Sequence, residues 1–336
     1  MNTSFTFSGQ LLKAALLRES TDIHFSPFPS ATNIYFRILG KRMLYKKITP
    51  QHYHLLLSHY KFISGMDIGE TRKPQNGAYQ YQQNNASYSL RLSTLPLNNM
   101  ESLAIRILPQ DQQYSLQDLF LFPYQVKRIK EWIANRSGLI LLTGPTGSGK
   151  TTALYTLLET ILKEKSYQTI TLEDPIEKEL QDILQVQVNE KAGVTYQTGL
   201  KAALRHDPDI IMIGEIRDKY TASFVFEAAL TGHLVLSTLH AKNAVGTIQR
   251  LLEMGIRKMD IIQTLIAVAS TQLIPLHMPN TVQKRAAILE LLEGEYLEKA
   301  VKGVDVHDFQ LETFEKLRRK AFAYGFINEE TYHETK

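Results

Sequence analysis

The stretch Gly144-Pro-Thr-Gly-Ser-Gly-Lys-Thr151 decides the fold of this chain, because it matches the phosphate-binding pattern G-x-x-x-x-G-K-[ST] at every position. An apolar run at Leu139–Thr143 precedes it and predicts a buried parallel strand. Apolar residues at helical spacing follow it over Thr152–Glu159. Strand, glycine loop and helix in this order are the context that the pattern requires, so a chance glycine turn is a poor alternative.

The chemistry of this stretch predicts a nucleotide site. Glycines allow several backbone N–H groups to face one anion, and the start of the following helix adds a partial positive charge. We expect Lys150 to reach the β- and γ-phosphates of ATP and the Thr151 hydroxyl to ligate Mg²⁺. The predicted nucleotide-binding residues of the loop are Gly144, Pro145, Thr146, Gly147, Ser148, Gly149, Lys150, Thr151 and Thr152.

The composition is typical of a soluble globular protein with two or three domains: 336 residues, of which 43% are hydrophobic and 21% charged. The chain contains no cysteine, which excludes disulfides, cysteine zinc sites and a thiol nucleophile. Its formal net charge of +4 is only mildly basic, so we expect no direct binding of nucleic acid. No apolar run approaches the ~20 residues that span a bilayer, and no signal peptide is recognisable. The predicted location is therefore the cytoplasm.

The order of predicted elements divides the chain into two domains joined by a linker. Residues 1–112 are expected to form a small α+β domain, with helices at 7–17 and 51–65 and several short strands. The segment 113–123 is the predicted linker, and its Leu-Phe-Leu-Phe run would pack on the next domain. Residues 124–336 are expected to form that second domain.

Strands alternate with helices in the second domain from Leu139 onward, which predicts an α/β fold with a mostly parallel sheet. After Ala244 the pattern becomes mainly helical, so we expect a helical C-terminal region. One further strand is expected at 286–291.

Two acidic residues follow predicted strands, at the strand ends where α/β sheets place their ligand sites. Glu173 precedes the chain-breaking Pro175, and we expect it to support Mg²⁺ or the attacking water; a surface turn is the alternative. Gly214 stands where many phosphate-loop enzymes have an Asp for Mg²⁺, and Glu215 follows it. We expect Glu215 to orient or deprotonate water, with a helix-capping carboxylate as the alternative. The sequence alone leaves open which of the two glutamates is the base, and we favour Glu215.

His233 and His240 stand at the two ends of the next apolar strand. A single histidine in such a place is more often a structural residue. Two histidines beside a nucleotide loop favour a role in sensing phosphate, so we expect His233 to bind the nucleotide and His240 to take part in catalysis.

Four motifs in this order resemble those of the secretion ATPases that drive type II secretion, type IV pili and competence pseudopili. Residues 144–152 resemble the Walker A motif of that family, and residues 170–177 resemble its Asp box. Residues 199–218 resemble its atypical Walker B motif, which also lacks the Asp, and residues 229–240 resemble its His box. The resemblance implies a phosphate-loop NTPase (RecA-like) motor domain that hydrolyses ATP.

The N-terminal region resembles the same family at Thr21–His24, Gly65–Ile68, Arg91–Pro96 and Glu101–Leu108. The resemblance implies a PAS-like domain that packs beside the motor and contributes arginines to the nucleotide site. Arg91 and Arg106 occupy the matching places, and an arginine near the γ-phosphate would stabilise the charge being transferred. The alternative is that both are strand arginines paired with local carboxylates.

The chain departs from the family pattern in several places. Lys201 and His206 stand where Arg and Gln are usual, and Lys242 follows the His box. Only ten residues separate Ile274 from Arg285, where long assembly ATPases carry a four-cysteine zinc insert, so no zinc is expected. A short, zinc-free chain with assembly-like N-terminal motifs most resembles the competence-pseudopilus ATPases of Gram-positive bacteria.

The resemblance also implies partners. It implies a homo-hexameric motor, peripheral at the inner face of the cell membrane, that acts on a polytopic platform protein and through it on pilin-like subunits. This work would assemble a pseudopilus for DNA uptake. Two alternatives stay open: a motor for pilus retraction or general type II secretion, and a nucleotide-binding scaffold with little hydrolysis.

Overall fold

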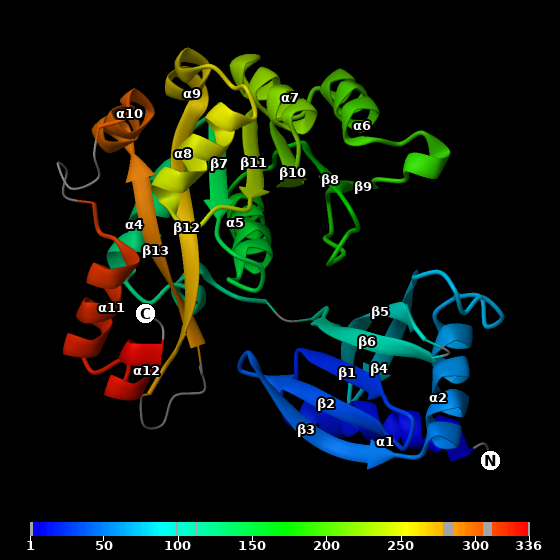
Figure 1. Cartoon of the computed structure of the whole chain (residues 1–336). Coiled ribbons are helices and arrows are strands. Elements are labelled where there is room, and N and C mark those ends of the chain that lie inside the picture. The colour runs from blue at the N-terminus through cyan, green and yellow to red at the C-terminus, as the bar shows by residue number, and fades with distance from the viewer. Residues whose placement is uncertain (1–2, 99, 112, 278–284, 305–310, 335–336) are drawn as a thin grey trace. The chain divides into compact units, whose positions relative to one another are not determined.

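The computed structural model describes residues 3–98, 100–111, 113–277, 285–304 and 311–334. The chain folds as two compact units, Met1–Gln112 and Gln113–Lys336, which are described in turn (Figure 1). The short segment 275–284, where no zinc insert is expected, lies partly outside the described residues.

The N-terminal unit is built on one 6-stranded sheet. Its strands are β1 (Asp22–Pro27), β2 (Thr32–Ile38), β3 (Lys41–Ile48), β4 (Gln75–Gln83), β5 (Ala86–Leu97) and β6 (Met100–Pro109). They lie in the order β3-β2-β1-β6-β5-β4, and each neighbouring pair is antiparallel. Buried positions alternate with partly buried or exposed ones along β6, as expected for a sheet with one covered and one open face.

Two helices, α1 (Thr3–Leu17) and α2 (Pro50–Ile63), cover one face of this sheet (Figure 1). Their apolar residues share one core with the strands, in which Leu12 of α1, Leu56 of α2 and Ile105 of β6 are buried. The Thr49 side chain caps α2 by accepting a hydrogen bond from the His52 N–H. The unit therefore has the predicted α+β architecture.

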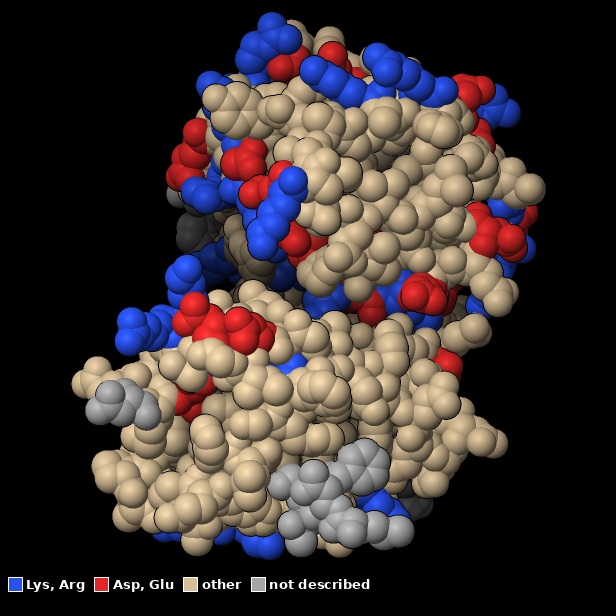
Figure 2. Space-filling view, turned by 90° about the vertical axis from the view of Figure 1, so that its right-hand side faces the viewer, with Lys and Arg blue, Asp and Glu red and all other residues tan. Residues whose placement is uncertain are grey.

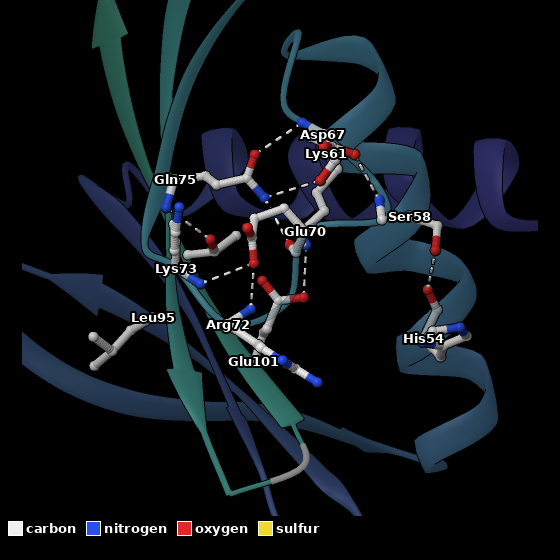
Figure 3. Close-up of polar contacts among 12 residues, drawn as sticks. His54, Ser58, Lys61, Asp67, Glu70, Arg72, Lys73, Gln75, Leu95 and Glu101 are labelled. Carbon is white, nitrogen blue, oxygen red and sulfur yellow. Dashed lines mark hydrogen bonds and ion pairs between the residues drawn. The ribbon is translucent and has the colours of Figure 1, made fainter.

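A buried ion pair joins α2 to the sheet (Figure 3). Lys61 Nζ donates to Glu101 Oε2 of β6 at 2.6 Å and to the carbonyl oxygen of Glu70 at 2.8 Å. The Lys61 and Glu101 side chains are only 2% and 4% exposed. Because a buried charge without its partner is costly, this pair holds the end of α2 against β6.

The second unit is built on a 7-stranded sheet. Its strands are β7 (Gly138–Thr143), β8 (Thr169–Glu173), β9 (Leu184–Gln187), β10 (Ile210–Ile216), β11 (Leu234–Leu239), β12 (Leu265–Pro275) and β13 (Arg285–Glu293). They lie in the order β13-β12-β7-β11-β10-β8-β9, and only the β12–β13 pair is antiparallel. The prediction of a mostly parallel sheet is confirmed. The strand that leads into the phosphate loop, β7, is buried at every residue.

Helices cover both faces of this sheet (Figure 1). They are α3 (Leu116–Leu119), α4 (Pro123–Ile133), α5 (Lys150–Glu164), α6 (Tyr196–Ala203), α7 (Lys219–Leu230), α8 (Ala244–Glu253), α9 (Lys258–Thr264), α10 (Gly294–Lys302), α11 (Phe314–Ala323) and α12 (Glu329–Glu334). Trp132 of α4 and Leu158 of α5 pack in the core on one face. Phe226 of α7, Ile248 of α8 and Leu297 of α10 pack in the core on the other face.

The segment 113–123, predicted as a linker, belongs to the second unit. It contains α3, and Leu116 and Phe120 are buried in the core beside α4 and α5. Phe122 packs with Leu317 of α11 in a smaller apolar cluster. The apolar run of this segment does pack on the second unit, so little of it is free to act as a spacer.

Helices make up most of the regular structure after Ala244, as predicted, but the region also contains a strand that was not predicted. β12 spans 11 residues and pairs with β7, the strand of the phosphate loop. The strand expected at 286–291 is present as the longer β13, which pairs with β12 along its whole length. In the part of the C-terminal region that the structure describes, five helices, α8 to α12, therefore combine with two strands of the central sheet.

The surface carries its charges in scattered groups. On the face drawn in Figure 2, Lys and Arg lie close to Asp and Glu, and wide areas carry neither sign. Two large apolar side chains of α2 face solvent in the N-terminal unit, Leu55 and Phe62. Among the residues that the structure describes, no helix has both the length and the apolar character needed to cross a membrane.

Candidate active site

The phosphate loop connects the end of β7 to the start of α5. Gly144 has a φ of +140°, and an added Cβ would lie 2.7 Å from both Ser148 Oγ and the Thr271 carbonyl oxygen, so only glycine fits there. Gly149, with a φ of +92°, precedes α5, whose first turn has no side-chain cap. The first N–H groups of α5 are therefore not used by a capping side chain, and such groups bind phosphate in other proteins.

Lys150 begins α5 and is largely buried. Its Nζ donates to the carbonyl oxygens of Gly144 and Pro145, both at 2.9 Å. Burial lowers the pKa of Lys150, whereas the negative charge of Glu215 raises it. Because these backbone partners are neutral, a phosphate would supply the opposite charge that the ammonium group favours.

Two threonines outside the motif support the loop from neighbouring elements. Thr271 of β12 hydrogen-bonds Ser148 Oγ at 2.8 Å and donates to the Thr143 carbonyl oxygen at 3.1 Å. Thr247 of α8 donates to Thr143 Oγ1 at 3.0 Å. These hydroxyls fix the start and the middle of the loop to the adjacent strand and helix.

Glu215 stands near the end of β10, and its two carboxylate oxygens have different partners. His240, just after β11, places Nε2 3.0 Å from Glu215 Oε1. Arg217 donates from Nε to Glu215 Oε2 at 3.0 Å. Thr238 of β11 donates to the Gly214 carbonyl oxygen at 2.7 Å, which fixes the backbone beside Glu215. The structure therefore brings together Glu215 and His240 at one edge of the sheet, as the sequence predicts.

Arg217 extends this cluster to the neighbouring strand end. It donates from one terminal nitrogen to Asp174 Oδ2 at 2.9 Å, while its Nε contacts Glu215. Burial would lower the pKa of Arg217, but the hydrogen bond and charge of Glu215 and the charge of Asp174 raise it. One guanidinium group thus connects the ends of β8 and β10.

Glu173, the last residue of β8, is buried and surrounded by donors. Tyr155 of α5 donates its hydroxyl to Glu173 Oε2. Thr171 and Gln185 donate to Glu173 Oε1 at 2.7 and 3.2 Å. At 3% exposure, the Glu173 carboxylate is held inside the protein. This position does not favour the expected role as a support for Mg²⁺ or for the attacking water.

His233 lies at the opposite edge of the sheet from the phosphate loop. It precedes β11, and its carbonyl oxygen accepts from the N–H of Gly138, the first residue of β7. His233 Nδ1 contacts Thr231 Oγ1 and the Ala228 carbonyl oxygen, both at 3.1 Å. A strand of this length separates its ends by roughly 20 Å. The position of His233 within this unit therefore contradicts its expected part in nucleotide binding by the same chain.

Arg91 and Arg106 form part of a row of charged residues across the N-terminal sheet. They are direct cross-strand partners on β5 and β6, and Asp22 of β1 is the next partner of Arg106. Arg106 Nε donates to Asp22 Oδ1 at 2.9 Å, and Arg37 of β2 lies 3.8 Å from the same carboxylate. Cross-strand partners share one face of a sheet, so Arg91 and Arg106 both lie on the face opposite the helices.

Few of the described side chains are placed where they could ligate Mg²⁺. Among the described residues, no three His, Asp or Glu side chains gather in a way that could hold a metal ion. Mg²⁺ commonly keeps several waters and binds through one or two side chains together with phosphate oxygens. Thr151, half-buried in the first turn of α5, is the hydroxyl that suits this pattern. The residues therefore fit Mg²⁺ bound together with a nucleotide.

Five contributors to the site were missed in the sequence: Asp174, Arg217, Tyr155, Thr247 and Thr271. Arg217 and Asp174 stand within the motifs quoted for the family. Arg217 lies between Glu215 and Asp218, and this pattern of charges could have indicated its part in the site. Tyr155 falls on the helical repeat of α5 and reads as a core residue. Thr271 lies on the strand that was not predicted, and no local signal indicates its contact with the loop.

Comparison with known proteins gives a consistent result. A family model described as Type II/IV secretion system protein matches residues 5–310. The chain is 42% identical over 342 residues to competence protein ComGA of Bacillus subtilis (strain 168), covering 97% of this chain and 96% of that protein. It is 43% identical over 343 residues to competence protein ComGA of Halalkalibacterium halodurans, covering 98% of each.

A solved structure shows the same fold. The Legionella pneumophila ATPase DotB superposes with a TM-score of 0.78 at 22% sequence identity. The match covers 98% of this chain and 95% of that chain. At this identity the match supports the fold, a phosphate-loop ATPase with an N-terminal α+β unit.

Proposed function

The chain belongs to the Type II/IV secretion system protein family, and we propose that it is the ATPase motor that assembles a competence pseudopilus for DNA uptake. The observation that carries the enzymatic part is the pairing of a complete phosphate loop with Glu215 on a nearby strand end. The competence assignment is supported by the two ComGA relatives, which match over nearly their whole length. Whole-length matches favour pseudopilus assembly over pilus retraction or general secretion.

The nucleotide would be held by the loop and the start of α5. Lys150 would exchange its contacts with two backbone oxygens for the β- and γ-phosphates, where its charge is better neutralised. Thr151 would hold Mg²⁺ together with phosphate oxygens and water. When bound, Mg²⁺ neutralises the charge that develops on the phosphates.

Glu215 would be the general base. Its carboxylate is anchored on both oxygens, by His240 on one side and by Arg217 on the other. These contacts keep the carboxylate oriented, as a group that aligns or deprotonates water must be. His240 would thereby connect the base to the end of β11.

The N-terminal unit would complete the site with Arg91 and Arg106. Their support is the family resemblance and their shared position on the open face of the N-terminal sheet. A positive charge close to the γ-phosphate in the transition state raises the rate of phosphoryl transfer. Movement of this unit against the motor during each cycle would then convert hydrolysis into mechanical work.

The partners follow from the family. We propose a homo-hexamer that lies in the cytoplasm, peripheral to the inner face of the membrane, and acts on a polytopic platform protein. Pilin-like subunits would be moved indirectly through that protein. The exposed Leu55 and Phe62 of α2 are available for a contact with a protein partner.

The proposal is tested in competent cells that carry Glu215→Gln in place of the wild-type chain. The substitution should abolish both pseudopilus assembly and DNA uptake while the protein accumulates to the wild-type level. Glu227→Gln, on α7 and away from the strand ends, serves as the matched control and should leave both unchanged. Normal DNA uptake with Glu215→Gln would indicate a nucleotide-binding scaffold instead of a motor.

A further inference from the structure

Tyr155 makes three hydrogen bonds at the point where α5 meets the end of β8. Its hydroxyl donates to Glu173 Oε2 and accepts from the backbone N–H groups of Glu177 and Lys178, at 3.2 and 3.3 Å. The side chain is 5% exposed. Tyr155 stands five positions after Lys150 on the same helix, so it belongs to the element that receives the phosphates.

Glu173 completes this buried cluster. Besides Tyr155, it accepts from Thr171 on its own strand and from Gln185 on β9. Gln185 also donates to the carbonyl oxygen of Lys178 at 3.0 Å. The carboxylate thus serves as a common acceptor for α5, β8 and β9, and the segment 174–178 is fastened from both sides.

The fastened segment carries Asp174, which faces the catalytic cluster. Asp174 accepts from Arg217, and Arg217 in turn donates to Glu215. A path therefore leads from the phosphate-loop helix to the proposed base: hydrogen bonds join Tyr155 to the backbone of Glu177 and Lys178, the chain connects these residues to Asp174, and hydrogen bonds continue through Arg217 to Glu215.

We propose that Tyr155 is a positioning residue for ATP hydrolysis: it fixes segment 174–178 to α5 so that Asp174 and Arg217 hold Glu215 in its working orientation. In this arrangement Glu173 is the buried anchor of the Tyr155 hydroxyl and does not ligand Mg²⁺. The inference rests on the proposed ATPase function and assigns a role to a side chain outside the four family motifs.

The chemistry of the cluster suits this role. Burial raises the pKa of Tyr155 well above its ordinary value, and the charge of Glu173 raises it further. The hydroxyl therefore stays protonated and donates a hydrogen bond to the carboxylate, while its oxygen accepts hydrogen bonds from the two N–H groups. Without the hydroxyl, one buried carboxylate oxygen and two backbone N–H groups each lose a hydrogen-bond partner. Segment 174–178 then shifts so that these groups find other partners.

The test compares Tyr155→Phe with the wild-type chain in steady-state ATP hydrolysis. The variant should lose roughly ten- to hundredfold in kcat, because a small misplacement of a catalytic group costs that much. KM for ATP should stay within about twofold, since the variant keeps every contact of the loop. Tyr167→Phe makes the same chemical change in the same unit, at a half-buried tyrosine just before β8, and should leave kcat unchanged.

Two further measurements separate positioning from metal binding. The Mg²⁺ concentration that gives half-maximal activity should be unchanged in both Tyr155→Phe and Glu173→Gln. Asp174→Asn, at a side chain 43% exposed, perturbs the same path without disturbing the core. It should lower kcat, and the double variant with Tyr155→Phe should be no slower than the slower single variant.

Several results of these measurements would overturn the positioning role of Tyr155. Wild-type kcat in a folded Tyr155→Phe, or independent multiplying losses in the double variant, would overturn the positioning role. An increased Mg²⁺ requirement in Glu173→Gln alone would restore Glu173 as a metal ligand and also overturn it. If Tyr155→Phe does not fold, Asp174→Asn decides the matter, and its wild-type kcat would overturn the inference. Absence of turnover in the wild-type chain would instead overturn the ATPase function itself.

Discussion

We expect nucleotide binding to depend more on Lys150 than on any other side chain. We expect Lys150→Ala to abolish ATP turnover while the protein still folds, because the residue's partners are backbone oxygens of a surface loop. ATP hydrolysis and the thermal unfolding midpoint should be measured together. Lys163→Ala, at an exposed position of the same helix, is the control and should behave as the wild type. Normal turnover in Lys150→Ala would remove the phosphate loop from the catalytic site.

Substitution of Lys61 measures how much the buried ion pair with Glu101 contributes to the stability of the N-terminal unit. Lys61→Met leaves Glu101 buried without its partner, so the unit should lose about 3–5 kcal/mol of stability. Denaturant unfolding of the variants measures this loss. Lys47→Met changes an exposed lysine of β3 and should fall within about 0.5 kcal/mol of the wild type.

A double substitution that removes both charges is the control for Lys61→Met. Lys61→Met combined with Glu101→Leu removes both charges and should recover much of the lost stability, because apolar groups can replace a buried pair. A double variant as unstable as Lys61→Met would mean that the lysine stabilises α2 by packing alone.

At the scale of secondary structure elements, β12 supports the phosphate loop through one hydroxyl. Thr271→Val keeps the shape of the side chain and removes its hydrogen bonds to Ser148 and Thr143. We expect KM for ATP to rise about threefold to tenfold, the effect of roughly 1 kcal/mol of lost hydrogen bonding. Binding of a fluorescent ATP analogue provides an independent measurement.

The neighbouring residue of β12 offers a matched control. Ser270 is buried on the same strand, and its Oγ has no hydrogen-bond partner among the described residues. Ser270→Ala should therefore leave nucleotide binding unchanged. Equal effects of the two substitutions would mean that β12 acts on the loop by packing and not through the Thr271 hydroxyl.

The same strand shows where sequence patterns stop being informative. β7, β8, β10 and β11 are short apolar runs bounded by polar or glycine residues, so their place could be predicted. Residues 265–275 instead continue directly from α9 without a turn residue, and an apolar run joined to a helix is not separable from that helix by periodicity. The supporting role of Thr271 could not be predicted for that reason.

The sequence predictions for His233 and Glu173 failed for two different reasons. In a parallel sheet, residues after a strand and residues before it lie at opposite edges, so the place of His233 could have been deduced from its position before β11. The burial of Glu173 could not be deduced, because it depends on Tyr155 and Gln185 from other elements. Glu215 lies near the end of β10 and His240 just after β11, so their place at the same edge of the sheet could be expected, and the structure brings them into contact.

At the scale of the whole molecule, the N-terminal unit should contribute charge to catalysis. Arg91→Ala and Arg106→Ala are expected to lower kcat more than tenfold and to change ATP binding little, because a charge needed mainly in the transition state acts on kcat. Steady-state kinetics and nucleotide binding measure the two effects separately. Arg42→Ala, at an exposed arginine of β3, should change neither.

A mixing experiment distinguishes contributions between subunits from local damage. If the protein works as a ring, adding Arg91→Ala subunits to Glu215→Gln subunits should give a rate that is not the sum of the two. Unfolding of the N-terminal unit by Arg91→Ala would instead indicate a structural arginine.

The hydrolysis rate of Glu215→Gln is the most direct test that this chain is an ATPase using Glu215 as its base. The substitution keeps the size of the side chain and removes the charge that His240 and Arg217 hold in place. We expect purified Glu215→Gln to bind ATP as tightly as the wild type and to hydrolyse it ~10²-fold more slowly, the size of a lost general base. Hydrolysis by Glu215→Gln at the wild-type rate, with ATP binding intact, would contradict this function for Glu215.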